Sequence, residues 1–302
     1  MKLVARSALL FFFLASTAVL AESPVGGAPQ YDRFLLPFHA SVPAFTGFWR
    51  VQWWLRNDGD APVDAFPVAL QCGLPPPPTP EGPPVTIVPA PAVGAHSTLS
   101  CLQGDVLPSF PVPGFVPVRD SVGAFLYVEK AREQLTVSGS VVWHTGWESA
   151  EATQLRAVPD SAFRTGTGSI LPITVAPNAR YAVRVYALPE TLDARELTIR
   201  VFEMQPQEVF IPQERLLATI SGELAVQQAS LPPCRGRCDL PDVALAPAIY
   251  QFFGLPTPER GFQFQSPIRV EISPRSRNVR WWALVTATNN STQQIQLFEV
   301  SQ

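Results

Sequence analysis

Alternation of apolar and polar residues is the dominant pattern along the chain, and it predicts β-strands. Residues 48–56, "FWRVQWWLR", show it most clearly, because every second side chain of a strand lies on the same face. One predicted face carries Trp49, Val51, Trp53 and Leu55, and the other carries Phe48, Arg50, Gln52, Trp54 and Arg56. The wholly apolar face predicts a half-buried strand. The following "NDGD" predicts a turn, and residues 63–70 are interpreted as the return strand.

Further strands are predicted in both halves of the chain from the same alternation. Residues 214–224 fit either a strand or a short helix. The other predicted strands are 122–130 paired with 135–145, then 152–158, 180–188 paired with 196–204, and 262–274.

The last stretch, 277–300, predicts a closing hairpin with the turn at "NNST". Its first strand has one face made of Val279, Trp281, Ala283, Val285 and Ala287, and another made of Arg280, Trp282, Leu284, Thr286 and Thr288. The stretch that ends the first half has a similar order of a Trp-bearing strand, a polar turn and a Gln-Leu strand. The two halves therefore look like an internal repeat, with the boundary at Pro159-Asp160.

The predicted fold class is all-β, with two tandem β-sandwich domains at 33–158 and 160–302. The 33 prolines agree with this class, because proline breaks long helices and suits rigid loops between strands. The stretches "FWRVQWWLRNDGDAPV" and "RWWALVTATNNSTQQIQLFEV" resemble the ends of Ig-like β-sandwich units in uncharacterised secreted bacterial proteins. Trp53 and Trp54 depart from that pattern, which usually has smaller residues there. The resemblance implies a fold and a secreted location, and it carries no activity.

Residues 1–21 are predicted to be a cleaved secretory signal peptide. Lys2 and Arg6 precede an apolar run from Ala8 to Leu20, and small residues stand before Glu22. Residues 22–32 predict a flexible lead-in. Residues 74–84 predict a stiff, extended proline-rich loop, either a spacer or a ligand for an aromatic groove on a partner.

The four cysteines, Cys72, Cys101, Cys234 and Cys238, predict disulfides, because an exported chain meets oxidising conditions. Local pairing, Cys72 with Cys101 and Cys234 with Cys238, is favoured among the three arrangements. A zinc site is the alternative, but it would require CxxC spacing or nearby histidines.

The charge balance and the absence of known motifs disfavour nucleic-acid binding and catalysis. Lys+Arg total 22 and Asp+Glu total 25, so the basic footprint that nucleic-acid binding requires is missing. The three histidines, His39, His96 and His144, are far apart, and the sequence contains no nucleophile elbow, zinc-protease motif or nucleotide-binding glycine loop. We therefore expect no catalytic site and no cofactor. A hydrolase would need one of these histidines beside a serine or carboxylate in a cleft.

Two weaker candidate sites are present. Asn57, Asp58, Asp60 and Asp64 offer oxygens for calcium, but they do not complete an EF-hand pattern, and a capped turn is the simpler interpretation. Trp54, Arg56, Trp282 and Tyr186 fall on the faces opposite the predicted cores. They fit ordinary cation–π cover of a sheet face, a patch that binds a glycan or a partner protein, or packing of the two domains together.

The sequence thus predicts an exported, non-enzymatic structural or adhesive protein, extracellular or periplasmic, with an envelope protein or polysaccharide as its partner. Nucleic acid is not expected to be a partner, and no transmembrane segment is expected in the mature chain. The alternatives are a carbohydrate-binding module that uses the exposed aromatics and a secreted hydrolase. Asn289 and Asn290 each begin a glycosylation sequon, whose use depends on the host.

Overall fold

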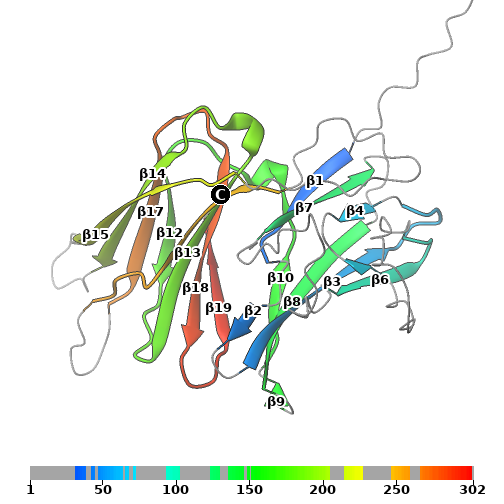
Figure 1. Ribbon diagram of the computed structural model, residues 1–302, viewed down its shortest axis with the longest axis horizontal. Coiled ribbons are helices and arrows are strands. Elements are labelled where there is room, and N and C mark those ends of the chain that lie inside the picture. Colours follow the sequence, from blue (N-terminus) through cyan, green and yellow to red (C-terminus); the bar gives the residue numbers. More distant parts are fainter. Residues whose placement is uncertain are drawn as a thin grey trace, which may run out of the picture.

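The protein is all-β in the computed structural model, which confirms the all-β part of the predicted fold (Figure 1). The structure describes residues 31–38, 42–44, 47–63, 65–67, 71–72, 93–102, 123–129, 135–145, 148–149, 151–204, 214–226, 246–258 and 266–300. The helical segments within these ranges are two single 3₁₀ turns, η1 (Asp160–Ala162) and η2 (Pro189–Thr191). The predicted signal peptide, the proline-rich loop, Asp64, His39, Cys234 and Cys238 lie outside the described residues.

The first half of the chain forms two antiparallel sheets. Sheet I has the order β11 (Val158–Pro159), β1 (Tyr31–Leu36), β7 (Ala124–Glu129) and β4 (Ala65–Pro67). Sheet II has the order β10 (Thr153–Arg156), β8 (Leu135–Thr145), β3 (Gly47–Asn57), β6 (Ser97–Leu102) and β5 (Gln71–Cys72). Two short strands, β2 (Val42–Ala44) and β9 (Glu148–Ser149), pair with β3 and β8.

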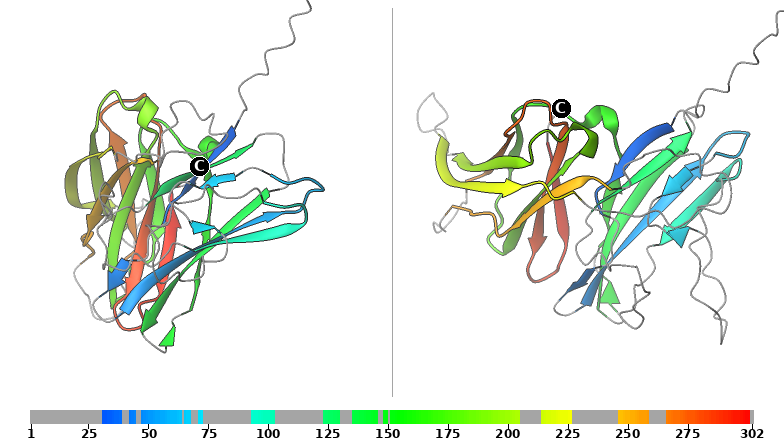
Figure 2. Two further views of the ribbon diagram at one scale, coloured as in Figure 1. Left: turned by 45° about the vertical axis from the view of Figure 1, so that its right-hand side comes forward. Right: turned by 45° about the horizontal axis from the view of Figure 1, so that its top comes forward.

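The second half also forms two antiparallel sheets, on the other side of the molecule (Figures 1 and 2). Sheet III has the order β12 (Gly168–Ile173), β17 (Ile268–Pro274), β14 (Glu196–Met204) and β15 (Glu214–Glu223). Sheet IV has the order β16 (Ala248–Phe253), β13 (Ala179–Ala187), β18 (Trp281–Asn289) and β19 (Ile295–Glu299). Residues 214–223, ambiguous from the sequence, are thus a strand.

The two halves share one strand order. The series β1-β7-β4 in sheet I corresponds to β12-β17-β14 in sheet III, and β10-β8-β3-β6 in sheet II corresponds to β19-β18-β13-β16 in sheet IV. Corresponding strands also follow one another in the same order along the chain. The strands predicted in 48–56 and 180–188 are therefore the corresponding strands β3 and β13.

Of the predicted strand pairs, the closing hairpin is confirmed, because β18 pairs with β19. Three other pairs are wrong: β4 pairs with β7 instead of β3, β14 lies in sheet III while β13 lies in sheet IV, and β7 and β8 lie in different sheets. In each case the chain crosses from one sheet to the other. Alternation shows which face of a strand is apolar, but it does not show which strand lies beside it.

Of the tryptophans that the alternation placed on core faces, Trp53 and Trp281 are fully buried, whereas Trp49 is partly exposed. Sheet IV differs from a half-exposed sheet, because eight consecutive residues of β18, Trp281–Thr288, are buried. Both faces of this strand are therefore covered. One face packs within the second half, and the other meets the first half.

The register of sheet II places Cys72 of β5 directly opposite Cys101 of β6. Opposed residues in antiparallel strands have Cα atoms about 4.5–5.5 Å apart, which falls within the range that a disulfide needs. We therefore expect peptide mapping without reductant to recover these two cysteines linked. Replacing both by alanine should lower the free energy of unfolding by roughly 3 kcal/mol. Recovery of both as free thiols from exported protein would contradict this pairing.

Candidate functional site

The junction between the two halves is the most elaborate arrangement of polar and aromatic side chains in the described structure. Tyr186 of β13 and Trp282 of β18 are opposite each other in register, and their ring centroids are 5.9 Å apart. Both side chains are buried, at 0% and 2% exposed. Tyr186 also lies directly over Gly123 of the first half, where an added Cβ would come within 2.7 Å of its ring. These contacts make the outer face of sheet IV an interior surface.

The segment that follows β1, Pro37 and Phe38, is held from both halves. The Tyr186 hydroxyl of the second half donates a hydrogen bond to the Pro37 carbonyl, and burial raises the pKa of this phenol, so it stays protonated. The Trp53 Nε1–H of the first half donates to the Phe38 carbonyl at 2.8 Å. The guanidinium of Arg184, from the second half, lies 5.0 Å from the centre of the Phe38 ring. The Pro37 carbonyl thus connects the two halves, and the adjacent Phe38 carbonyl fixes the segment within the first half.

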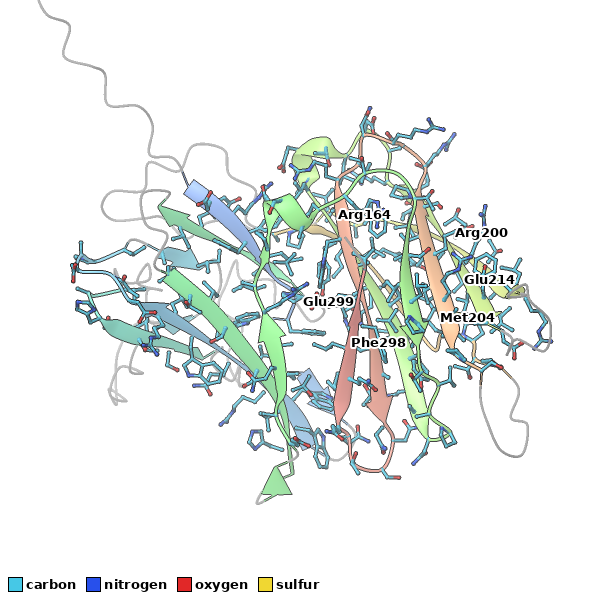
Figure 3. The ribbon with its side chains drawn as sticks, turned by 180° about the vertical axis from the view of Figure 1, so that it is seen from behind. Arg164, Arg200, Met204, Glu214, Phe298 and Glu299 are labelled. Atoms are coloured by element: carbon cyan, nitrogen blue, oxygen red, sulfur yellow. The ribbon has the colours of Figure 1, made fainter. Side chains whose placement is uncertain are left out.

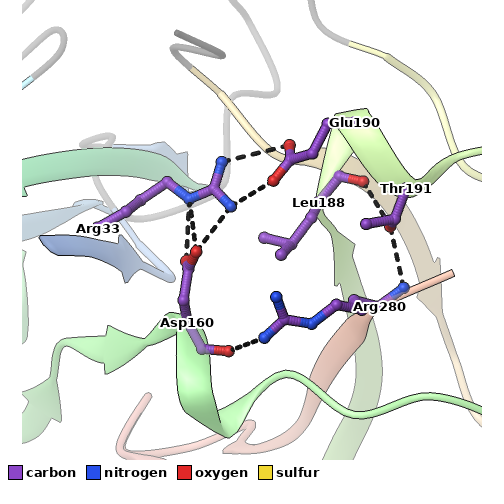
Figure 4. A network of polar contacts seen from close by, with 6 residues as sticks. All are labelled: Arg33, Asp160, Leu188, Glu190, Thr191 and Arg280. Atoms are coloured by element: carbon purple, nitrogen blue, oxygen red, sulfur yellow. Dashed lines mark hydrogen bonds and ion pairs between the residues drawn. The ribbon is translucent and has the colours of Figure 1, made fainter. Parts of the chain in front are cut away.

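A charged network lies beside this segment (Figure 4). Arg33 of β1 binds both carboxylate oxygens of Asp160 in η1, with its shortest contact at 2.8 Å, and it also pairs with Glu190 in η2. Its guanidinium lies 4.7 Å from the centre of the Phe125 ring. Arg280 donates to the Asp160 carbonyl at 2.6 Å, so the linker between the halves is bound from both sides.

The sequence accounts for how these groups reach one another. Arg33 stands in a strand whose neighbouring positions Leu35 and Leu36 are fully buried, so the strand is fixed by the core. Asp160 and Glu190 each occupy the first turn of a short 3₁₀ segment that directly follows a strand. The Thr191 hydroxyl donates to the Leu188 carbonyl and accepts from the Arg280 N–H, which fixes η2 against β18.

The pKa of Glu190 responds to this network. Burial alone would raise that pKa, but the hydrogen bonds and positive charge of Arg33 outweigh burial, so the pKa lies below its ordinary value of 4.5. A carboxylate with a depressed pKa in the folded state stabilises the fold above its unfolded pKa, and that stability is lost as the pH falls through the folded value. The junction should therefore weaken in acid, below about pH 4.5.

We expect Arg33→Met to lower the free energy of unfolding by about 2 kcal/mol at pH 7. The loss should be smaller than for a fully buried pair, because Asp160 and Glu190 are partly exposed. Urea titrations from pH 7 to pH 3 should also show a flatter acid dependence than in the wild type, since Glu190 loses its partner. Arg56→Met, at the exposed Arg56–Asp58 pair, should change stability by less than about 0.5 kcal/mol. Equal effects of the two substitutions would contradict the assignment.

A second set of contacts joins the edge strands β10 and β19. The Thr153 hydroxyl donates to the Ile295 carbonyl at 2.7 Å, and Arg156 pairs with Glu299. Gln294, in the turn before β19, donates to the Glu151 carboxylate at 3.0 Å. Figure 3 shows Glu299 on the side of sheet IV toward the first half, whereas Arg200 and Glu214 lie on the far side of the second half. The junction therefore extends along a whole edge of the sheet.

Two of the four aromatic and basic candidates from the sequence belong to this junction. The expectation that Tyr186 and Trp282 lie on an exposed outer face is wrong, because the first half covers that face. The alternative interpretation, that alternating arginines and aromatics pack the two halves together, describes what the structure shows. Trp54 and Arg56 are separate from them, on the outer face of sheet II, with Trp54 partly exposed and Arg56 exposed.

The acidic turn after β3 is organised by the side chain of Asn57. The buried Asn57 amide donates to the carbonyls of Ala61, Val93 and Gly94, and its oxygen accepts from the Gly59 N–H. Asp58 pairs with Arg56 and Asp60 with His96, so their carboxylates have different partners. Within the described ranges, no group of three or more His, Cys, Asp or Glu side chains could hold a metal ion.

His96 and His144, the two histidines that the structure describes, do not lie together in a cleft. His96 Nε2 lies 2.9 Å from Asp60, but this pair is on an exposed turn, with the two side chains 66% and 98% exposed. His144 is partly buried in β8. In the glycosylation sequons, the side-chain Oδ1 of Asn289 caps the turn by accepting from the Ser291 and Thr292 N–H groups, and the side-chain Oδ1 of Asn290 accepts from Arg180.

The junction residues that sequence reasoning missed are Arg33, Pro37, Asp160 and Glu190. Arg33 lies within the short strand β1, and the other three stand in short segments that follow strands, where alternation carries no information about partners. The sequence carries no signal that identifies this junction. Trp281 and Trp282 in succession suit a strand that is covered on both faces, but Trp53 and Trp54 also stand in succession, and Trp54 is partly exposed.

The chain matches no protein-family model, no curated protein and no solved structure. The described part of the chain contains no helix with the length and hydropathy that crossing a membrane would require.

Proposed function

We propose that this protein is an exported, non-enzymatic structural or adhesive protein, whose two halves act as one rigid unit. The unit presents its sheet surfaces to an envelope protein or a polysaccharide. Export is supported by the signal-peptide pattern of residues 1–21 and by the opposed Cys72 and Cys101.

The two-sided burial of β18 is the observation that carries this proposal. Interfaces between domains that move are typically small and polar, so relative motion is the default expectation. Here the interface includes fully buried aromatic rings and a multiply bonded arginine, and so resembles a domain core. A rigid connection of this kind suits a protein that bears a load or holds binding surfaces at a fixed spacing.

We further propose that each half is an Ig-like β-sandwich and that the two arose by internal duplication. The support is the shared strand order of seven corresponding strands, together with the similar closing stretches in the sequence. Ig-like sandwiches are used widely as binding and spacing modules, but fold alone assigns no ligand.

The function can be tested with the mature form, residues 22–302, immobilised against envelope fractions and a glycan panel. We expect specific retention of one envelope component, and cell fractionation should find the protein outside the cytoplasm. Binding to nothing would favour a purely structural subunit. A cytoplasmic location in the native host, or turnover of a substrate by the purified protein, would contradict the proposal.

A carbohydrate-binding role on sheet II is the alternative that a specific observation favours. Trp54 is partly exposed, and its register partners on the two neighbouring strands are Ser100 and Ser138. A tryptophan face surrounded by small polar side chains can stack on a sugar ring. Trp54→Ala should then abolish retention of a glycan, whereas Phe253→Ala, at an exposed aromatic elsewhere, should leave it unchanged. Equal retention by wild type and Trp54→Ala would exclude this role.

A further inference from the structure

Arg184 has no carboxylate partner among the residues that the structure describes, although it lies at the junction of the two halves. It lies in the middle of the outer face of sheet IV, opposite Leu284 on one side and Gln251 on the other. Its guanidinium carbon is 5.0 Å from the centre of the Phe38 ring and 5.8 Å from that of Phe253. The side chain therefore lies between an aromatic ring of the first half and one of the second.

The hydrogen bonds of this guanidinium are incomplete. Its Nη1 donates to the Thr286 hydroxyl at 2.9 Å, while its Nε is buried and has no acceptor. By contrast, Arg33 and Arg269 each contact two carboxylates. Among the described residues, no ion pair neutralises Arg184. Its five N–H donors thus exceed the acceptors that the described residues supply.

An unpaired cation in this position is costly. Burial lowers the pKa of Arg184, which shows that the surroundings disfavour the charged form. Arginine nevertheless stays protonated in proteins, so the charge remains and an unsatisfied donor persists beside it. Stacking on aromatic rings compensates only in part, because it engages the faces of the guanidinium and not its N–H edge.

We propose that Arg184 is the anchor of a carboxylate-binding site at the junction of the two halves. A carboxylate is the anion whose planar pair of oxygens matches the edge of a guanidinium. The residue is partly exposed although its Nε atom is buried, so a ligand would approach the guanidinium from its Nη atoms. Phe253, 67% exposed beside it, supplies an apolar surface for the group that carries the carboxylate. The expected ligand is therefore a carboxylate on an apolar or aromatic group, either a small molecule or the C-terminus of a partner polypeptide.

Titration with sodium phenylacetate, followed by NMR of the arginine Nε–H groups, tests the site directly. We expect the Arg184 signal, assigned by its loss in Arg184→Lys, to shift and saturate. Acetate should produce the same shift only at higher concentration, and sodium chloride of equal ionic strength should produce none. An unchanged Arg184 signal throughout the phenylacetate titration would overturn the proposal.

Thermal unfolding provides a second readout with matched variants. Saturating phenylacetate should raise the Tm of the wild type and of Arg200→Met by about 3 °C beyond the effect of sodium chloride. Arg184→Met should show no such rise; an equal rise in this variant would place binding elsewhere and overturn the assignment. A peptide that ends in phenylalanine with a free carboxylate, compared with its C-terminal amide, distinguishes a polypeptide source from a small molecule.

Discussion

Replacing Tyr186 by alanine is expected to lower the free energy of unfolding by about 4 kcal/mol and to uncouple the two halves. The substitution removes a fully buried ring that packs against Trp282 and over Gly123, and it leaves the Pro37 carbonyl without its donor. Because these contacts span the junction, the loss should fall on the coupling between the halves. Calorimetry should then resolve two transitions where the wild type shows one.

Two control variants separate the parts of this effect. Tyr186→Phe keeps the ring and removes only the hydroxyl, so it should cost about 1–2 kcal/mol and retain one transition. Tyr181→Ala removes a buried tyrosine from the same strand, but on the opposite face, where its hydroxyl contacts Thr174 and Ala176 of the second half. It should destabilise the second half without freeing the first from it. Two transitions in Tyr181→Ala but not in Tyr186→Ala would contradict the role given to Tyr186.

Much of the secondary structure could be predicted from the sequence, because burial of one face imposes a period of two on a strand. The pattern in 48–56 placed Trp53 in a core, and the pattern in 277–300 identified the β18–β19 hairpin. A hairpin is a local structure, since its turn and both its strands are contiguous in the chain.

Strand neighbours that are distant in the chain could not be predicted in this way. The pairing of β3 with β8 joins residues about ninety positions apart, and no local signal in either strand specifies it. The predicted pairing of consecutive strands was wrong wherever the chain crosses from one sheet to another. The junction could not be predicted for the same reason, since Arg33 and Asp160 are separated by 127 positions in the chain.

Trp282 illustrates a further ambiguity, because alternation defines an outer face without revealing whether that face meets solvent. In sheet II the outer-face Trp54 is partly exposed, whereas in sheet IV the outer-face Trp282 is covered by the first half. The two positions look alike in sequence, each beside another tryptophan and close to an arginine. Only the packing of one half against the other distinguishes them.

We expect the second large loss of stability when a side chain is introduced at Gly139, because the Trp53 ring occupies the space that this side chain would need. The two residues are opposite each other in register, and a Cβ on Gly139 would lie 2.6 Å from the ring. Trp53 has no room to move, since it is fully buried and its Nε1–H is bonded to the Phe38 carbonyl. Gly139→Val should therefore lower the free energy of unfolding by about 3 kcal/mol, although valine favours strands.

A double-mutant cycle, followed by urea unfolding, tests whether this loss arises from the Trp53 contact. Trp53→Leu alone should be destabilising, because it leaves a cavity and an unpaired carbonyl at Phe38. In the Trp53→Leu background, Gly139→Val should cost about 2 kcal/mol less than in the wild type, since valine then enters space the indole has vacated. Ser138→Val, at the exposed neighbouring position on the opposite face, should change stability by less than about 0.5 kcal/mol. Additive effects of the two core substitutions would show that the glycine is required for a reason other than the tryptophan ring. The same cycle bears on the junction, because the bond from Trp53 to Phe38 holds the segment on which Tyr186 and Arg184 converge.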